Sequence, residues 1–315
     1  MGKKVLLFGD VGIDDTIALI YAYLHDQIDI VGVVADYGNV SRENALANVH
    51  YIRSLLNVSE DLKIIAGAEK PMTGEKPTFY PEIHGEYGLG PIKPPAATNG
   101  VVDENFYEIV EIIKRYGDEL TIVNIGRLTS LATMFILYQR LMSNVKDYYL
   151  MGGAFWVPGN VTAVSEANFY ADPIAANIVL TNAHDVTIIP LNVTEQAIVT
   201  PQMVDYINEV GKVKVIKPLL DYYYDFYKKR NPAVQGSPVH DALTLMATIH
   251  EDMFQFTTLP VTIVQAKEGV ERGQSIADIR PYANNQQEQE LKKHRIAFQL
   301  DYKKFLSDFM DVMTR

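Results

Sequence analysis

The stretch that decides the fold stands near the start of the chain, where residues 4–24 read KVLLFGDVGIDDTIALIYAYL. Its apolar run over residues 4–8 predicts a strand that is buried on both faces. The segment after the glycines predicts a helix over residues 13–24, with Asp14 and Asp15 in its first turn, where the helix dipole favours negative charge. A buried strand that leads into a helix is typical of α/β proteins.

Strand and helix patterns alternate in the same way along the rest of the chain. Ser41 and Thr200 are suited to cap the helices that follow them. The alternation predicts an open, mostly parallel, Rossmann-like sheet with helices on both faces. No repeat or linker divides the chain, so we expect one domain over residues 1–315. Further strands are expected over residues 29–35, 63–66, 120–124, 148–151, 186–190, 259–265 and 295–300, further helices over 41–56, 103–116, 128–141, 173–181, 200–210, 213–229, 242–250 and 302–313, and a long loop over 67–100.

Composition excludes several functional classes. The chain has 315 residues, 28 Lys and Arg, 39 Asp and Glu, a net charge of −11 and no cysteine. Without cysteine there is no disulfide framework, no thiolate zinc site and no cysteine nucleophile. The acidic balance argues against nucleic acid or an anionic membrane as a partner, and no apolar run approaches the roughly 20 residues of a membrane helix. We therefore expect a cytoplasmic protein.

Polar residues follow several of the expected strands. Ligands of open parallel sheets bind beyond the carboxyl ends of the strands, so these residues would meet at one edge. They are Asp10, Asp14 and Asp15 after the first strand, Asn39 after the second, Arg127 after residues 120–124, and Asn160, Glu166 and Asn168 after residues 148–151; the apolar Ile125 directly follows residues 120–124 and lies at the same edge.

The three aspartates of the first loop indicate a metal site. Asp10, Asp14 and Asp15 lie within six residues, and carboxylates at such close quarters raise one another's pKa unless a cation relieves the repulsion. Oxygen ligands without cysteine favour calcium or magnesium over zinc. The alternative is a structural role, in which Asp14 caps the helix and Asp15 is solvated.

Other candidates lie later in the chain. His240 and Asp241 precede a helix, so Asp241 is either an N-cap or a distant metal ligand, and His240 either a surface histidine or a general acid. Tyr223 and Tyr227 share one helix face, as core packing or as an aromatic lid over a flat ligand. His84 lies among glycines in the long loop, where a functional role is favoured.

Taken together, these segments resemble the inosine-uridine nucleoside hydrolase family. The resemblance covers most of the chain, and it implies an open α/β fold that holds one calcium ion deep in a pocket. Asp10, Asp15 and Asp241 match the family's carboxylate ligands, and Ile125 matches the position that supplies a backbone carbonyl. The matching segments are GDVGIDD (9–15), YGN (37–39), AGAEKP (66–71), HGEYGLG (84–90), IGRLTSLA (125–132), MGGAFWVPGNVTAVSEANFYADPIAA (151–176), PLNVT (190–194) and VHDA (239–242).

The resemblance also implies a ribose pocket and a reaction. In that reaction calcium would orient a water molecule, Asp10 would take its proton, and His240 would protonate the leaving base as an N-ribosidic bond is hydrolysed to ribose and free base. Asp14, Asn39, Glu166 and Asn168 match residues that hold the ribose hydroxyls, and Met151 and Asn160 match other pocket positions.

The substrate range follows from the residue before the distal aspartate. A histidine there, His240, resembles members with broad purine and pyrimidine specificity or a pyrimidine preference, which act in nucleoside salvage and catabolism. We expect a homo-oligomer, a dimer or a tetramer, whose ligand is a small-molecule ribonucleoside.

The chain departs from the family pattern at several positions. Phe8 replaces the first aspartate of the usual D-x-D-P-G motif, Arg127 stands where proline is usual, Ser130 where asparagine is usual, and Ala167 where an aromatic is common. Phe8 and Ala167 motivate an alternative, a nucleoside-binding protein with weakened catalysis. A magnesium phosphohydrolase is disfavoured, since Phe8 occupies the position of its nucleophilic aspartate.

Overall fold

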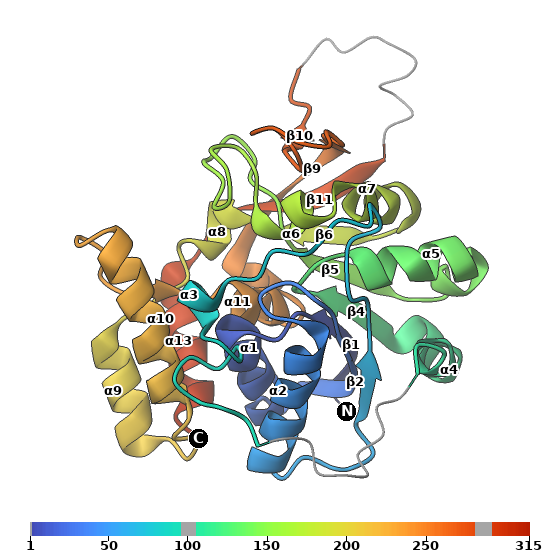
Figure 1. Cartoon of the computed structure of the whole chain (residues 1–315). Helices are drawn as coiled ribbons and strands as arrows, with labels where there is room; N and C mark the ends of the chain where they lie inside the picture. The colour runs from blue at the N-terminus through green and yellow to red at the C-terminus, as the bar shows by residue number, and fades with distance from the viewer. Residues whose placement is uncertain (1, 96–104, 281–291) are drawn as a thin grey trace.

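The computed structural model describes residues 2–95, 105–280 and 292–315, and its centre is a nine-stranded sheet (Figure 1). The strand order is β10-β9-β11-β6-β5-β4-β1-β2-β3. Neighbours from β11 to β3 pair in parallel, whereas β9 runs antiparallel to β11 and to β10. The open, mostly parallel sheet predicted from the sequence is therefore confirmed. Its strands are β1 (Lys3–Gly9), β2 (Ile28–Ala35), β3 (Lys63–Ala66), β4 (Leu120–Asn124), β5 (Asp147–Met151), β6 (Val186–Ile189), β9 (Phe254–Ile263), β10 (Ser275–Ala277) and β11 (Lys293–Leu300).

Alternate side chains of β1 enter two separate apolar cores. Val5 and Leu7 pack in the core on one face of the sheet, and Leu6 and Phe8 in the core on the other face. The first face carries α1 (Ile13–Leu24), α2 (Arg42–Leu55), α9 (Pro201–Val210), α10 (Ile216–Arg230), α11 (His240–Ala247) and α13 (Tyr302–Met313); the second carries α4 (Glu108–Tyr116), α5 (Thr129–Met142) and α7 (Pro173–Asn182) (Figure 1).

Several predicted boundaries agree with the structure, and others are corrected. The ranges of β3, β4, α1 and α13 are as predicted, and Ser41 and Thr200 cap α2 and α9 through their side chains. The helix expected over residues 242–250 lies instead at His240–Ala247, and the one expected from residue 213 begins at Ile216. The helix expected from residue 103 begins at Glu108, and its first two expected positions lie outside the described residues. Within the described part of the chain, no helix is both long and apolar enough to cross a bilayer.

Short elements are the main feature that the sequence did not predict. Within the expected loop 67–100, of which residues 96–100 are not described, one helical turn forms at α3 (Pro81–His84). The others are α6 (Ala167–Ala171), α8 (Leu191–Thr194), β7 (Ile198–Val199), β8 (Ser237–Pro238) and β10. Unlike the short buried strands β3 and β4, these elements have neither a periodic pattern nor a continuous apolar run of four or more residues, so tertiary contacts decide them.

Phe8 belongs to the apolar core. It is fully buried on the face that carries α4, α5 and α7. The position at which the sequence departs from the usual aspartate therefore contributes packing.

Asp36, which follows β2, is a fully buried carboxyl that joins three segments. Its Oδ1 accepts hydrogen bonds from the amide of Ala68 at 2.6 Å and from the hydroxyl of Ser130, while Oδ2 has no partner among the described residues. Burial raises the pKa of Asp36 to about 8, because it penalises the charged form. The folded chain therefore keeps a proton there at pH values at which the unfolded chain has released it.

We expect Asp36→Asn to become more stable relative to the wild type as the pH rises. Between about pH 4 and pH 8 the folded wild type binds one proton more than the unfolded chain at this position, so its free energy of unfolding falls as the pH rises. The variant lacks this contribution and should gain about 1 kcal/mol per pH unit relative to the wild type in that window. Urea unfolding of both proteins at pH 5, 6.5 and 8 measures the difference; a difference that is constant with pH contradicts the assignment.

Candidate active site

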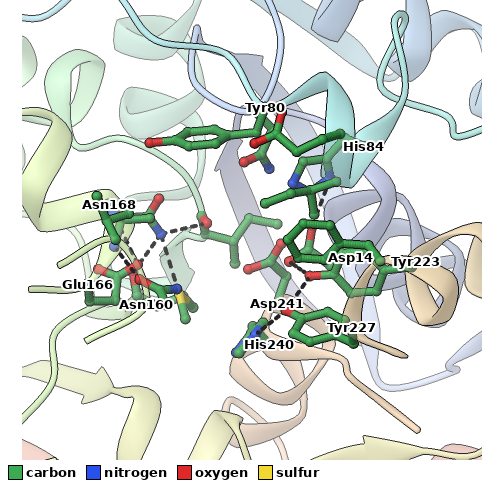
Figure 2. Close-up of a pocket in the computed structure, with 18 of the residues that line it drawn as sticks. Asp14, Tyr80, His84, Asn160, Glu166, Asn168, Tyr223, Tyr227, His240 and Asp241 are labelled. Atoms are coloured by element: carbon green, nitrogen blue, oxygen red, sulfur yellow. Dashed lines mark hydrogen bonds and ion pairs between the residues drawn. The ribbon is translucent and has the colours of Figure 1, made fainter. Parts of the chain in front are cut away.

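A cavity of about 280 Å³ opens at the carboxyl edge of the parallel strands (Figure 2). All the site residues predicted from the sequence line it except Asp10 and Asp15, which are fully buried. The loops after β1, β2, β4 and β5 supply one part of the wall, and α10 and the first turn of α11 supply another. This is the edge at which open parallel sheets bind ligands.

Three carboxylates crowd together beside the cavity. Each of Asp14, Asp15 and Asp241 offers one oxygen atom such that all three atoms lie within 4.8 Å of one another. All three residues lie in the first turns of α1 and α11, where the helix dipoles favour negative charge. The dipoles offset part of the repulsion, but no cationic side chain belongs to this group.

Asp10, Asp14 and Asp15 each use one carboxylate oxygen in hydrogen bonds. The Oδ2 of Asp10 accepts from the amide of Asn39 at 2.5 Å, and the Oδ2 of Asp15 accepts from the Asn39 side chain at 3.0 Å. The Oδ2 of Asp14 accepts from the hydroxyl of Tyr223 at 3.3 Å. In all three residues Oδ1 is buried without a hydrogen-bond partner among the described residues. Buried oxygens of this kind are costly unless a cation or a ligand group satisfies them.

The raised pKa values of these carboxyl groups also indicate a place for a cation. Burial raises the pKa of Asp14 to about 6, with a further contribution from Asp10, and it holds the pKa of Asp15 and of Asp241 well above the usual range. A divalent cation would remove the repulsion and restore the ionised forms. The donor set, made of carboxylate oxygens, fits a hard cation such as calcium or magnesium.

Asp10 differs from the other acids because a buried arginine neutralises it. The Nη1 of Arg127 lies 3.0 Å from the Oδ2 of Asp10, and the Arg127 side chain is 3% exposed. The same nitrogen donates to the side-chain oxygen of Asn168 at 2.7 Å. Gly38 permits this approach, since a Cβ at that position would lie 2.0 Å from Asp10 and 2.8 Å from Arg127.

A second group of side chains forms the wall opposite the carboxylates, at the left of Figure 2. The side-chain amide of Asn168 donates to the carbonyl oxygens of Ile125 at 3.0 Å and Met151 at 3.1 Å. Glu166 caps α6 and accepts from the amides of Gly153 and Asn168. These bonds fix the wall before any ligand arrives, as a binding site for polyols requires.

Tyr223 and Tyr227 of α10 and His240 of α11 form the floor of the cavity. The hydroxyls of Tyr223 and Tyr227 lie 3.4 Å apart, and that of Tyr227 lies 3.4 Å from the Nε2 of His240. The Nδ1 of His240 lies 2.8 Å from the hydroxyl of Thr194 in α8. Together with the Tyr223–Asp14 bond, this makes a continuous chain of polar groups from Thr194 to Asp14. Burial lowers the pKa of His240 to about 4, so the ring is neutral near pH 7.

His84 lines the cavity but also has a structural role. Its Nδ1 accepts a hydrogen bond from the amide of Ile13, the first residue of α1, at 3.1 Å. Burial lowers the pKa of His84 to about 3, and the nearby Arg127 acts in the same direction. The neutral ring therefore caps α1, and its other nitrogen is left for a ligand.

Arg127, Tyr80 and Thr194 are among the residues of this region that were not predicted as site residues. Arg127 was noted as a residue near a strand end and as a departure from the family pattern, and a charged residue soon after a strand was the available signal. Thr194 ends the matching segment PLNVT, but no role was assigned to it, and Tyr80, in the long loop, had no pattern that marked it. The single tryptophan, Trp156, does not line the cavity; it is 58% exposed and stacks on Phe298 with ring centroids 5.2 Å apart.

Comparisons with known proteins agree with the geometry. The family described as inosine-uridine preferring nucleoside hydrolase matches residues 5–307. The chain is similar to an inosine-uridine preferring nucleoside hydrolase of Crithidia fasciculata, with 29% identity over 100% of this chain and 98% of that protein. It is 30% identical to uridine nucleosidase 1 of Arabidopsis thaliana over 81% of this chain and 76% of that protein. The solved structure of a purine-preferring ribonucleoside hydrolase from Gardnerella vaginalis superposes with a TM-score of 0.88, at 29% identity, over 99% of this chain and 98% of that one.

We expect Arg127→Met to destabilise the metal-free protein by about 3–5 kcal/mol, because it leaves the buried Asp10 carboxylate without its counter-charge. Arg315→Met is the matched control. Arg315 pairs with Asp26 and Asp311 at the surface, where loss of a pair costs about 0–1 kcal/mol. Urea unfolding in the presence of a chelator measures both. Equal decreases in the free energy of unfolding for the two variants would show that the Asp10–Arg127 pair contributes no more to stability than a surface ion pair.

Proposed function

Because this chain belongs to the inosine-uridine preferring nucleoside hydrolase family, we propose that it hydrolyses the N-glycosidic bond of purine and pyrimidine ribonucleosides, releasing ribose and the free base. One observation carries the proposal. Three kinds of group meet at one cavity: buried carboxylates with unused oxygens, an amide-lined wall, and the linked side chains of Tyr227 and His240. The wall is suited to bind a sugar, and the Tyr227–His240 pair is suited to contact a leaving nucleobase. We propose that the whole chain forms one domain around this cavity.

We propose calcium as the cofactor, held by Asp10, Asp15, Asp241 and the backbone carbonyl of Ile125. The unused Oδ1 atoms of Asp10 and Asp15, and the position of Asp241 beside Asp15, support this ligand set. Bound calcium would supply Lewis-acid polarisation of the attacking water. In this proposal the Oδ1 atom of Asp10 binds the cation, while its Oδ2 atom stays bound to Arg127 and Asn39.

Asp10 is the proposed proton acceptor. The Arg127 and Asn39 bonds to Oδ2 fix the orientation of the carboxylate and leave both lone pairs of Oδ1 available, one for the cation and one for the proton. Arg127 also opposes the effect of burial on the Asp10 pKa, so it favours the ionised form that a base requires.

Asp14, Glu166 and Asn168 are proposed to bind the ribose hydroxyls, with Asn39, Met151 and Asn160 completing the wall. As the bond to the base breaks, the sugar acquires positive charge of the oxocarbenium type. Carboxylates fixed around the ring stabilise that charge more than they stabilise the neutral substrate, so they lower the barrier.

The leaving nucleobase needs a proton, and the hydrogen-bonded groups of Tyr223, Tyr227 and His240 on the cavity floor can deliver it. With Tyr227 donating to Tyr223 and Tyr223 donating to Asp14, the free acceptor of Tyr227 faces the Nε2 of His240. In the protonated form of His240 both ring nitrogens donate, and Nδ1–H then donates to the hydroxyl of Thr194. We propose this imidazolium as the proton donor, which becomes neutral imidazole as the base leaves, with Tyr227 and Tyr223 contacting the base. Because burial lowers the pKa of His240 to about 4, the protonated form is a minor species near pH 7.

The proposed substrate range is broad, and nucleoside salvage or catabolism is the proposed setting. Relatives are named for uridine, for inosine with uridine and for purine nucleosides, so the family resemblance favours no single base. The cavity floor offers hydroxyl and imidazole groups, which can bond to either ring type.

We expect the calcium-loaded protein to release ribose from both inosine and uridine, and a chelator to abolish the reaction. Asp10→Asn should lower kcat/KM about 100-fold to 10,000-fold, because it removes the proton acceptor but keeps the shape of the side chain. Asp36→Asn is the matched control, since it changes a buried carboxyl that does not line the cavity. If neither nucleoside is cleaved while both bind in calorimetry, the protein is a nucleoside-binding protein and the proposal fails.

We expect His240→Ala to slow inosine about 100-fold and nitrophenyl riboside less than tenfold. The reason is that a nitrophenolate leaves without protonation, whereas hypoxanthine does not. Tyr224→Phe is the matched control, because Tyr224 lies on α10 but outside the cavity lining. Initial rates with both substrates give the ratio. Equal slowing of the two substrates by His240→Ala would remove His240 from the role of proton donor.

A further inference from the structure

The loop that joins β9 to β10, residues 264–274, lies directly against the backbone of α6. Gly273 has a φ of +71°, and a Cβ at this position would lie 2.4 Å from the Cα of Tyr170. No side chain fits between the two backbones. Helix α6 contains Asn168 and is capped by Glu166, and both side chains belong to the amide-lined wall at the left of Figure 2. The β9–β10 loop therefore lies behind that wall.

Arg272 of this loop bonds to the end of α6. Its side chain is 5% exposed. Its Nε donates to the carbonyl oxygen of Tyr170 at 2.9 Å, and its Nη2 donates to that of Ala171 at 3.2 Å. The last carbonyls of a helix have no partner within the helix, and a helix of five residues has few internal bonds to hold it together. Arg272 supplies the bonds that α6 cannot make by itself.

The same loop also holds the chain that leads into α6. The hydroxyl of Thr162 donates to the carbonyl oxygen of Val270 at 2.6 Å. The hydroxyl of Ser275, the first residue of β10, accepts from the amide of Ala154 at 2.9 Å. The segment that carries Asn160, Glu166 and Asn168 is therefore anchored to one loop before, within and after the site residues. None of residues 264–274, all of which the structure describes, lines the active-site cavity.

The other contact of Arg272 carries less weight. Its Nη1 donates to the Oε1 of Glu75 in the long loop at 2.9 Å. The side chain of Glu75 is 42% exposed, and an ion pair with such access to water contributes about 0–1 kcal/mol. The bonds to the carbonyls of α6 are buried, so they are the ones whose loss would move the wall.

We propose that Arg272 is a positioning residue of the enzyme, which holds α6 so that Asn168 and Glu166 keep the geometry that binds the sugar. The inference rests on the proposed function. The bonds from Asn168 to the carbonyls of Ile125 and Met151 fix its side chain only while the backbone of α6 stays in place. A displacement of about 1 Å in a group that positions a substrate can cost about 100-fold in rate.

The test measures KM for uridine and the Kd for calcium in variants of the full chain. We expect Arg272→Met to raise KM at least about tenfold, because the wall is displaced, and to change the Kd for calcium less than about threefold, because the proposed carboxylate ligands lie on other elements. Arg272→Lys should recover part of the loss, since a lysine keeps the charge but lacks the planar fork that reaches two carbonyls.

Arg295→Met is the matched control. Arg295 lies on β11, bonds to Glu251 through both terminal nitrogens and does not line the cavity, so its loss should leave KM as it is. A KM for Arg272→Met within about twofold of the wild type would overturn the inference, as would equal increases in the two arginine variants.

A double-mutant cycle separates positioning from a general loss of structure. If Arg272 acts through Asn168, then adding Arg272→Met to Asn168→Ala should raise KM less than about threefold further, because the group that Arg272 positions is already gone. Effects on KM that multiply would show that Arg272 acts elsewhere and would overturn the inference.

Two further measurements cover the remaining outcomes. If Arg272→Met does not fold, Thr162→Val tests the same anchoring from the other side of the wall, since it removes the bond to Val270; an unchanged KM would then overturn the inference. If the wild type cleaves neither uridine nor inosine, the proposed function fails by itself, and the calorimetric affinity for uridine replaces KM. An affinity that is equal in the wild type and in Arg272→Met, or absent from both, would overturn the inference.

Discussion

Repulsion between buried carboxylates is the constraint on which the rest of the structure depends. Asp10, Asp14, Asp15 and Asp241 lie together at one edge of the sheet, and burial alone would drive their pKa values upward. The fold lessens the cost in three ways: the first turns of α1 and α11 present their dipoles, Asn39 and Tyr223 donate hydrogen bonds, and Arg127 pairs with Asp10. What these groups leave unsatisfied is a set of carboxylate oxygens suited to a divalent cation.

The same arrangement divides the cavity by chemistry. Donors and acceptors that are already fixed by hydrogen bonds lie around Asn168, and the hydroxyl and imidazole groups lie around Tyr227 and His240. A nucleoside has the same division, with a polyol at one end and a base at the other. Arg127 adds a buried cation at the edge of the amide-lined wall, where it bonds to Asn168 and pairs with Asp10.

The sequence predicted those features that follow from periodicity and from strand ends. The β1–α1 segment, the parallel order of the sheet and the edge at which Asn39, Ile125 and Asn168 meet are of this kind. Side-chain pairing is not, because it depends on rotamers and on segments far apart in the chain. No pattern showed that Arg127 would pair with Asp10, that the hydroxyl of Tyr223 would donate to Asp14, or that His84 would cap α1. Phe8 is the opposite case, because the sequence marked it as a departure from a motif and the structure places it in the apolar core.

The most direct test of the central claim is a crystal structure of the protein with calcium and a ribose analogue. The account predicts one ion at about 2.3–2.6 Å from oxygens of Asp10, Asp15, Asp241 and the Ile125 carbonyl, with the sugar hydroxyls on Asp14, Glu166 and Asn168. An ion held only by Asp14, Asp15 and Asp241, with both Asp10 oxygens remote from it, would contradict the account. A cavity that binds the sugar with no ion among the carboxylates would contradict it as well.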